Sequence, residues 1–146
     1  MAEPVAPPFE DQLAIREVFA RYAWAYDCRD FEAVGRLFTA DGVMVAAGRD
    51  RRTGRQEIVS WLRQHVVENH LDKVMQHHVQ HLVLDGNADR CRAWSYWMVP
   101  ARIQGGGCVV GAFGWYEDEL VKQADRWYFQ RRAFHDGMPD GLPWEG

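Results

Sequence analysis

The sequence is poor in cysteine, and the cysteines it has do not pair in a recognisable way. Cys28, Cys91 and Cys108 are odd in number and far apart, and no CxxC spacing occurs among the 146 residues. Neither a disulfide framework nor a zinc knuckle is therefore indicated. An HExxH motif is also missing, so we expect no metal site.

An excess of positive charge is absent as well. Lysine and arginine number 17 against 21 aspartate and glutamate residues, which leaves a net charge of -4 at pH 7. Binding to a phosphate backbone needs a basic stripe, so we expect no nucleic-acid partner. The closest arginine cluster, formed by Arg49, Arg51, Arg52 and Arg55, falls in a predicted loop and is interpreted as a solvated connection.

Long apolar segments are missing too. No stretch is apolar enough to cross a bilayer, so we expect no membrane partner. Residues 1–8 contain three prolines but neither the positive nor the apolar region of a signal peptide. Together these absences predict a cytoplasmic protein.

Signatures of nucleophilic and nucleotide chemistry are not found either. Ser60 and Ser95 lack the GxSxG elbow that exposes a nucleophilic serine. The run Gly105-Gly106-Gly107 is not followed by GK[ST], so it predicts a hairpin turn and not a phosphate cradle.

Aromatic residues, in contrast, are plentiful. Seven Trp, seven Phe and five Tyr make up 13% of the chain, enough to fill a core and line a cavity. The length and the 47% apolar content are typical of one globular domain. We expect this domain over residues 11–136, after a flexible arm (1–10) and before an irregular Gly/Pro-rich tail (137–146).

The first half of the chain has the spacing of amphipathic helices. From about residue 11, apolar side chains recur at i, i+3, i+4, i+7 and i+11: Ile15, Val18, Phe19, Tyr22 and Tyr26. Asp30 is placed to cap a second, short helix that carries Phe31 to Phe38. A turn at 39–42, a short strand at 43–47 and a third amphipathic helix at about 54–67 are predicted next.

The second half changes to the alternation of strands. Strands are predicted over residues 75–84, 91–103, 108–120 and 126–135, joined by turns. In the second of these, either Trp94, Tyr96 and Met98 or the opposite set of side chains is buried. Helices followed by an antiparallel meander predict an α+β fold. We expect three N-terminal helices packed on a curved, mostly antiparallel sheet that encloses a pocket.

Asp27 is the first residue with a candidate chemical role. It lies five positions after Tyr22, about 140° around the helix, which puts a carboxylate at the edge of the buried face. An isolated aspartate at a helix end is usually a surface acid or a cap. Its place beside Tyr22 and Tyr26 keeps open the alternative of a buried carboxylate that orients another group.

Three histidines within five positions are the second candidates. Alternation predicts His77 and His81 on one face and His78 on the other. Four residues of strand separate His77 from His81 by about 13 Å, too far for both to ligate one metal. A histidine facing the pocket would be suited to acid–base chemistry near neutral pH, although a purely structural role is the alternative. A bulge near Gln76 would exchange His77 and His78.

Adjacent arginines in the last predicted strand are the third candidates. If the strand is regular, one of Arg131 and Arg132 points toward the helices and the other toward solvent. The inward arginine would either pair structurally with a carboxylate or bind an anion or oxyanion in the pocket.

These motifs, in this order, resemble SnoaL-like proteins of the nuclear transport factor 2-like superfamily. The resemblance covers about residues 10 to 135. It is carried by Tyr22-x-x-x-Tyr26-Asp27-x-x-Asp30-Phe31, Leu37-Phe38-x-x-Asp41-Gly42, Thr53-Gly54-Arg55-x-x-Ile58, His77-x-Val79, Asp85-Gly86-Asn87-Ala88, Ser95-Tyr96 and Trp127-x-Phe129-x-x-Arg132. Within the superfamily the pattern is most similar to scytalone dehydratase, bile acid 7α-dehydratase and hexachlorocyclohexane dehydrochlorinase. The resemblance implies a cone-shaped fold, no cofactor and a homo-oligomer, a trimer or a dimer.

The resemblance also implies roles for individual residues. A His-Asp dyad falls on His77 and Asp27, and further catalytic positions fall on Tyr22 and Arg132. The remaining candidates for substrate binding are Phe19, Tyr26, Trp61, His81 and Tyr96. Many relatives have Asn where this chain has His81, which leaves the substrate open.

The resulting functional hypothesis is a cofactor-independent lyase. A dehydration or other β-elimination on a small hydrophobic, aromatic or polycyclic substrate would use the dyad as general base. The alternatives are a double-bond isomerase of the ketosteroid-isomerase kind and a non-catalytic protein. The latter would bind a ligand or serve as a structural subunit, like the β-subunit of ring-hydroxylating dioxygenases.

Overall fold

The predicted apolar stripe from Ile15 to Tyr26 is the buried face of a long first helix. The computed structural model describes residues 2–46, 50–70 and 73–146. Helix α1 (Phe9–Asp27) buries Ile15, Val18, Phe19, Tyr22 and Tyr26, the side chains that the spacing predicts. It begins two residues earlier than expected, directly after Pro8, whose fixed φ suits a helix start. Asp27 is its last residue.

The two shorter helices also follow the predicted signals. Asp30 caps α2 (Phe31–Arg36), because its side-chain oxygen accepts a hydrogen bond of 3.0 Å from the Ala33 N–H. Helix α3 (Arg55–Asn69) starts after Gly54, whose φ of 89° lies in the left-handed region that glycine tolerates best.

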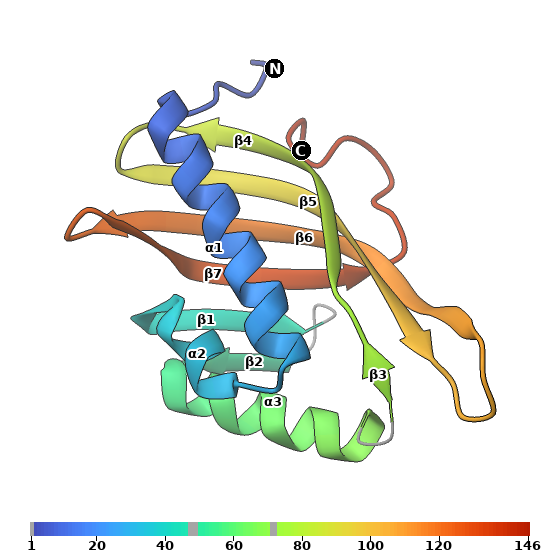
Figure 1. The fold of residues 1–146 in the computed structure, drawn as a ribbon. Helices are drawn as coiled ribbons and strands as arrows, with labels where there is room; N and C mark the ends of the chain where they lie inside the picture. The colour runs from blue at the N-terminus through green and yellow to red at the C-terminus, as the bar shows by residue number, and fades with distance from the viewer. Residues whose placement is uncertain (1, 47–49, 71–72) are drawn as a thin grey trace.

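Four long strands form the predicted antiparallel meander. They are β4 (His78–Gly86), β5 (Arg90–Arg102), β6 (Cys108–Gln123) and β7 (Arg126–Asp136), with the short β3 (Val74–Met75) on the edge of β5. The helices pack against this curled sheet, which forms a half-barrel, and α1 crosses it (Figure 1). The α+β, cone-shaped fold is thereby confirmed.

The sheet extends further than the sequence pattern indicated. Strand β1 (Phe38–Ala46) includes the predicted turn at 39–42 and pairs in parallel with β7, with a shift of register between Phe38 and Val43. Strand β2 (Asp50–Thr53) occupies the expected arginine-rich loop and pairs with β1. The prediction of a loop was wrong here because charged residues are compatible with an exposed edge strand. Arg49 lies outside the described residues.

A bulge in β4 changes the predicted alternation of the histidines. Between the paired positions Gln80–Tyr96 and Val83–Trp94, β4 has one residue more than β5, and His81 has a φ of 57°. The extra residue reverses the facing of the side chains that follow. The prediction that His81 shares a face with His77 is therefore wrong.

The bulge leaves Leu82 packed against the helical core, whereas His81 is exposed and contacts Tyr96 edge-on at 5.5 Å between ring centroids. On β5 the inward side chains are Ala93, Ser95 and Trp97, and Trp94 and Tyr96 point to the outer face. Alternation left two registers open for β5. The structure has the register in which Trp94 and Tyr96 face outward and the opposite set of side chains is buried.

Buried apolar side chains form two clusters between the helices and the sheet. The larger joins all three helices to β1, β4, β5, β6 and β7, and the smaller contains Trp97, Val99 and Tyr116. Met75 and Val79 pack against both clusters. The segment from Met75 in β3 to Val79 in β4 therefore connects the two clusters of the core.

The segment that contains Val5 and the tail after β7 both contact the sheet. Val5 accepts a hydrogen bond from the Gly86 N–H and donates its own N–H to Asp85. The tail after β7 has no regular element and returns over the outer face, where Trp144 meets Trp94 at 5.8 Å between ring centroids.

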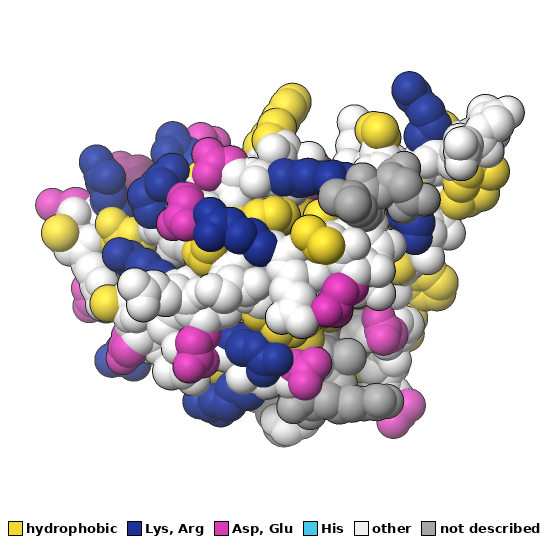
Figure 2. Space-filling view, turned by 90° about the horizontal axis from the view of Figure 1, so that it is seen from below, with side chains coloured by type: hydrophobic (Ala, Val, Ile, Leu, Met, Phe, Trp, Pro, Cys, Tyr) yellow, Lys and Arg dark blue, Asp and Glu magenta, His cyan; other side chains and the backbone are white. Residues whose placement is uncertain are grey.

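None of the helices in the described ranges has the length and apolarity to cross a membrane. On the face seen in Figure 2, acidic and basic side chains are interspersed and no region of one sign dominates. This face therefore offers no basic stripe to a nucleic acid.

A buried carboxylate ties the start of α1 to the hairpin between β6 and β7, and its loss should destabilise the fold. Asp11 accepts a 2.8 Å hydrogen bond from Trp127 Nε1 and pairs with Lys122 Nζ at 2.7 Å. We expect Asp11→Ala to lower the free energy of unfolding by about 1–3 kcal/mol, because it leaves the indole N–H buried without a partner. Urea denaturation measures this. Glu17→Ala, which removes an exposed pair with Arg21, is the control and should change it by less than about 1 kcal/mol.

Candidate active site

Asp27 and His77 meet where helix α1 ends beside a break in the sheet edge. His77 lies between β3 and β4. Its ring Nδ1 is 2.6 Å from Asp27 Oδ1, and its backbone N–H donates to Asp27 Oδ2 at 2.8 Å. Because both carboxylate oxygens contact one residue, Asp27 holds the backbone and the ring of His77 together.

This contact determines which nitrogen of the imidazole is free. With an ionised Asp27, Nδ1 carries the hydrogen of the short contact, so a neutral ring has its lone pair on Nε2. Nε2 has no hydrogen-bond partner among residues 2–46, 50–70 and 73–146. The side chains of His77 and Asp27 are 9% and 17% exposed, so water screens their interaction only partly.

Two tyrosines of α1 extend the site into the core. The Tyr26 ring lies 4.3 Å from the His77 ring, and the Tyr22 ring lies 6.1 Å from that of Tyr26. Burial raises the pKa of Tyr22 to about 12 and raises the pKa of Tyr26 as well. Both phenols are consequently neutral hydrogen-bond donors near pH 7.

A cavity of about 240 Å³ lies beside Asp27, and His77 is not among the residues that line it. It lies between the ends of α1 and α3 and the short strand β3. It is slightly smaller than the roughly 300 Å³ of the smallest usual ligand pockets. Its lining residues are Tyr26, Asp27, Arg29, Val66, His70, Lys73, Val74 and Met75.

The two adjacent arginines of β7 point in opposite directions, as the strand pattern predicts. Arg131 is half-buried and lies 3.7 Å from Glu117. Arg132 is completely buried, and its guanidinium carbon lies 3.6 Å from the Tyr116 ring centre and 4.1 Å from that of Tyr22. The rings of Phe129 and Phe19 complete this aromatic enclosure.

Asp118 is a buried neighbour of Arg132 that the sequence pattern did not single out. It is the cross-strand neighbour of Arg132, with 3.5 Å between Oδ1 and Arg132 Nε, and both side chains are fully buried. Burial raises the pKa of Asp118 to about 7, although the positive charge of Arg132 opposes the shift. Alternation along β6, which puts Tyr116, Asp118 and Leu120 on one face, was the signal that could have found it.

The other predicted binding residues lie apart from the dyad. Phe19 is in the aromatic enclosure of Arg132, with its ring 5.4 Å from that of Phe129. Trp61 stacks on His65 at 4.8 Å within α3 and lies 6.2 Å from Phe134. His81 and Tyr96 are on the outer face of the sheet, because the bulge in β4 turns His81 away from the helices.

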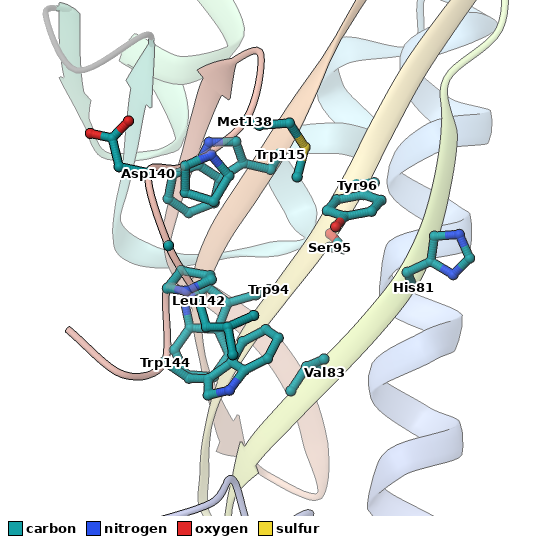
Figure 3. A pocket seen from close by; sticks show the side chains of 13 residues that line it. His81, Val83, Trp94, Ser95, Tyr96, Trp115, Met138, Asp140, Leu142 and Trp144 are labelled. Atoms are coloured by element: carbon teal, nitrogen blue, oxygen red, sulfur yellow. The ribbon is translucent and has the colours of Figure 1, made fainter. Parts of the chain in front are cut away.

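That outer face has a cavity of its own, of about 410 Å³. Side chains of β4, β5 and β6 and of the C-terminal tail surround it, among them His81, Trp94, Tyr96 and Trp144 (Figure 3). The dyad is not part of its lining. This cavity therefore lies apart from the contact between Asp27 and His77.

The described parts of the chain contain no group of three or more His, Cys, Asp or Glu side chains arranged to hold a metal ion. The three cysteines are all free, and Cys91 alone among them is buried.

A comparison with protein families identifies the domain. The SnoaL-like domain family matches residues 7–133. The chain belongs to the SnoaL-like family. The family has members of the polyketide cyclase and dehydratase type. None of the curated proteins matches the chain.

Solved structures share the fold of this SnoaL-like domain at low sequence identity. Aln2 from a Streptomyces species has a TM-score of 0.83 at 19% identity, over 90% of this chain and 94% of that chain. ActVI-ORFA from Streptomyces coelicolor has a TM-score of 0.77 at 20% identity, over 93% and 100%. A protein from Catenulispora acidiphila, in complex with S-DNPA, has a TM-score of 0.74 at 27% identity, over 86% and 92%.

The raised pKa of Asp118 predicts a dependence of stability on pH. The folded protein holds a proton on Asp118 up to about pH 7, whereas the unfolded chain releases it near pH 4. Stability should therefore fall as the pH rises from about 4 to about 7, by up to about 4 kcal/mol. Asp118→Asn should lack this contribution.

The measurement is the difference in free energy of unfolding between the wild type and Asp118→Asn at several pH values. The difference is needed because burial lowers the pKa of His65, His70 and His135, which changes stability in the opposite sense. A difference that stays constant from pH 4 to pH 8 would contradict the prediction.

Proposed function

We propose that this SnoaL-like domain is a cofactor-independent lyase that eliminates water, or another leaving group, from a small hydrophobic cyclic substrate. The observation that carries the proposal is the double contact of Asp27 with the Nδ1 and the backbone N–H of His77. A carboxylate in this position orients the ring, keeps Nε2 unprotonated and stabilises the imidazolium formed during reaction.

The reaction would begin with proton transfer from carbon to His77 Nε2. The electron pair of the broken C–H bond forms the new double bond or an enolate, and the C–O bond to the leaving hydroxyl breaks. The imidazolium returns its proton to the departing oxygen, which leaves as water. The elimination therefore balances with the residues of the chain alone.

Neutral phenols and a buried guanidinium would support this step. The Tyr26 and Tyr22 rings follow His77 into the core, and the Tyr22 ring in turn contacts Arg132. Hydroxyl donors in a site of low water content stabilise negative charge on oxygen more strongly than they do in water. The aromatic side chains suit a substrate that is itself a ring.

Double-bond isomerisation would use the same base and differ in the last step, because the proton returns to carbon. Solvent-deuterium exchange into a panel of cyclic ketones and hydroxy-ketones detects the shared first step. We expect exchange with the wild type, and we expect His77→Ala to reduce its rate by about 10²–10⁴-fold.

The matched control is His78→Ala, because His78 is the next residue along the chain and bonds Gln76 and not the dyad. It should retain the wild-type exchange rate. Equal exchange in the wild type and in His77→Ala would remove the general-base proposal.

Asp27→Asn tests the orienting role without removing the contact. The amide oxygen can still accept from the His77 N–H, but the amide NH₂ would face Nδ1 and favour the tautomer with hydrogen on Nε2. We expect the exchange rate to fall by about 10²–10⁴-fold while the melting temperature changes little. Unchanged exchange would show that Asp27 has only a structural role.

Tyr22→Phe removes the hydroxyl of Tyr22 and keeps its ring, so it tests the hydroxyl alone. The ring contact with Arg132 stays, so the fold should lose less than about 1.5 kcal/mol. We expect the exchange rate to fall about tenfold or more, because one donor to the developing oxyanion is lost. Thermal denaturation measures the change in stability, and the exchange assay on the same sample measures the change in rate.

The cytoplasmic location and the assembly into a homo-oligomer remain predictions. For the oligomer, we expect subunits to meet on the outer face of the sheet, because exposed apolar side chains gather there and on the tail. They include Tyr96, Phe113, Met138 and Leu142.

A further inference from the structure

The outer face of the sheet has a cavity that the proposed elimination does not use. It measures about 410 Å³, which is within the size range of ligand pockets, and neither His77 nor Asp27 lines it. Strands β4, β5 and β6 form one wall of this outer cavity, and the tail residues 138–144 form the opposite wall (Figure 3). A ligand bound there would therefore lie outside the cone, with the sheet between it and the helices.

Aromatic rings dominate the lining of the outer cavity. Three indoles contribute to it, those of Trp94, Trp115 and Trp144, together with the phenol of Tyr96. The Trp94 and Trp144 rings meet at 61° with 5.8 Å between their centroids, so they form two adjoining surfaces of different orientation. Rings that surround a space in this way recognise quaternary ammonium groups, because the negative face of each ring attracts a cation.

Two of these indoles are also contacted from outside the outer cavity. The Arg92 guanidinium carbon lies 4.7 Å from the Trp94 ring centre, and His135 stacks on Trp115 at 4.1 Å between ring centroids. Neither Arg92 nor His135 is part of the lining. The cavity therefore meets other parts of both indoles, and the contact with Arg92 shows that the Trp94 ring accepts a cation.

The charge of the outer cavity suits a cation as well. Among the residues that the structure describes, no lysine or arginine lines it, and Asp140 is its one acidic residue. The tail over residues 137–146 contains Asp140 and Glu145 and neither lysine nor arginine. A wall of this composition attracts cations and disfavours anions.

We infer that the outer cavity binds a free small molecule that carries a quaternary ammonium group. The indoles would hold the cation against their rings, and the acidic tail would attract it from solution. The ligand enters as a whole molecule, because residues 138–144 cover the side away from the sheet. This site is independent of the proposed lyase, since His77 and Asp27 are not part of its lining.

Choline and 3,3-dimethylbutan-1-ol test the role of the charge, because they have the same shape and differ in one atom, a charged nitrogen in choline and a carbon in the alcohol. Each is titrated into the isotope-labelled full chain, and the indole N–H signals are followed by NMR. Choline should bind about 3- to 30-fold more tightly than the alcohol. It should shift the signals of Trp94, Trp115 and Trp144 and leave those of Trp24 and Trp127 in place. Equal affinities, or shifts confined to other indoles, would overturn the inference without any altered protein.

Trp144→Leu removes one indole and keeps an apolar side chain on the tail. We expect it to weaken the binding of choline at least about threefold and to change the affinity for the alcohol less than about twofold. Trp24→Leu is the matched control, because it also loses one indole, from the exposed side of α1. It should leave both affinities unchanged. Wild-type affinity for choline in a Trp144→Leu protein that circular dichroism shows to be folded would contradict the site.

Asp140→Asn tests the attraction by the tail. We expect choline to bind about 1.5- to 5-fold more weakly at low ionic strength, since one exposed charge is lost. The difference from the wild type should disappear in about 0.5 M NaCl, because salt screens exposed charges. Equal affinities of the wild type and the variant at low ionic strength would overturn the role of Asp140.

Other occupants of the outer cavity predict different results. If a second copy of the chain fills it, sedimentation will show a dimer and choline will shift none of the three indole signals. If it holds a lipid headgroup, the protein will sediment with phosphatidylcholine vesicles and will not bind free choline. Either result would overturn the inference.

His77→Ala separates the cation site from the proposed lyase. This variant should bind choline with wild-type affinity. Choline binding in a wild type that catalyses no deuterium exchange would contradict the lyase alone. Exchange that depends on His77, without binding of choline, would contradict the cation site alone.

Discussion

The contact between Asp27 and His77 is the interaction on which the geometry of the candidate site depends. It joins the last residue of α1 to the break between β3 and β4, 50 positions further along the chain. One carboxylate oxygen satisfies a backbone N–H at the break, and the other orients the imidazole. A substitution that disturbs the end of the helix would therefore also disturb the orientation of the His77 ring.

A second buried contact places charged groups in the interior of the domain. Arg132 is enclosed by four aromatic rings and has Asp118 as its neighbouring opposite charge. Removing a guanidinium from water is costly, and one counter-charge at 3.5 Å offsets that cost only in part. The domain thus keeps polar groups where an apolar core would be more stable.

Local sequence patterns predict much of the fold and part of the candidate site. The 3.6-residue spacing of Ile15 to Tyr26, the cap at Asp30 and the alternation along β5 to β7 each reflect the immediate surroundings of one element. Family resemblance added the partnership of Asp27 and His77, which the geometry of the contact matches. The parallel pairing of β1 with β7 and the edge strand β2 were missed, because pairing between distant segments has no local signal.

What the sequence by itself determined is the periodicity, and with it the inward position of Tyr22, Tyr26 and one of two adjacent arginines. Only the tertiary structure decided the outcome at His81, where one extra residue in β4 turns the side chain to the outer face. It alone paired Asp118 with Arg132, since that contact depends on the register of two strands. The physical reason is common to both: a period of two residues predicts a face only while the strand stays regular, and bulges and register are set by the neighbouring strand.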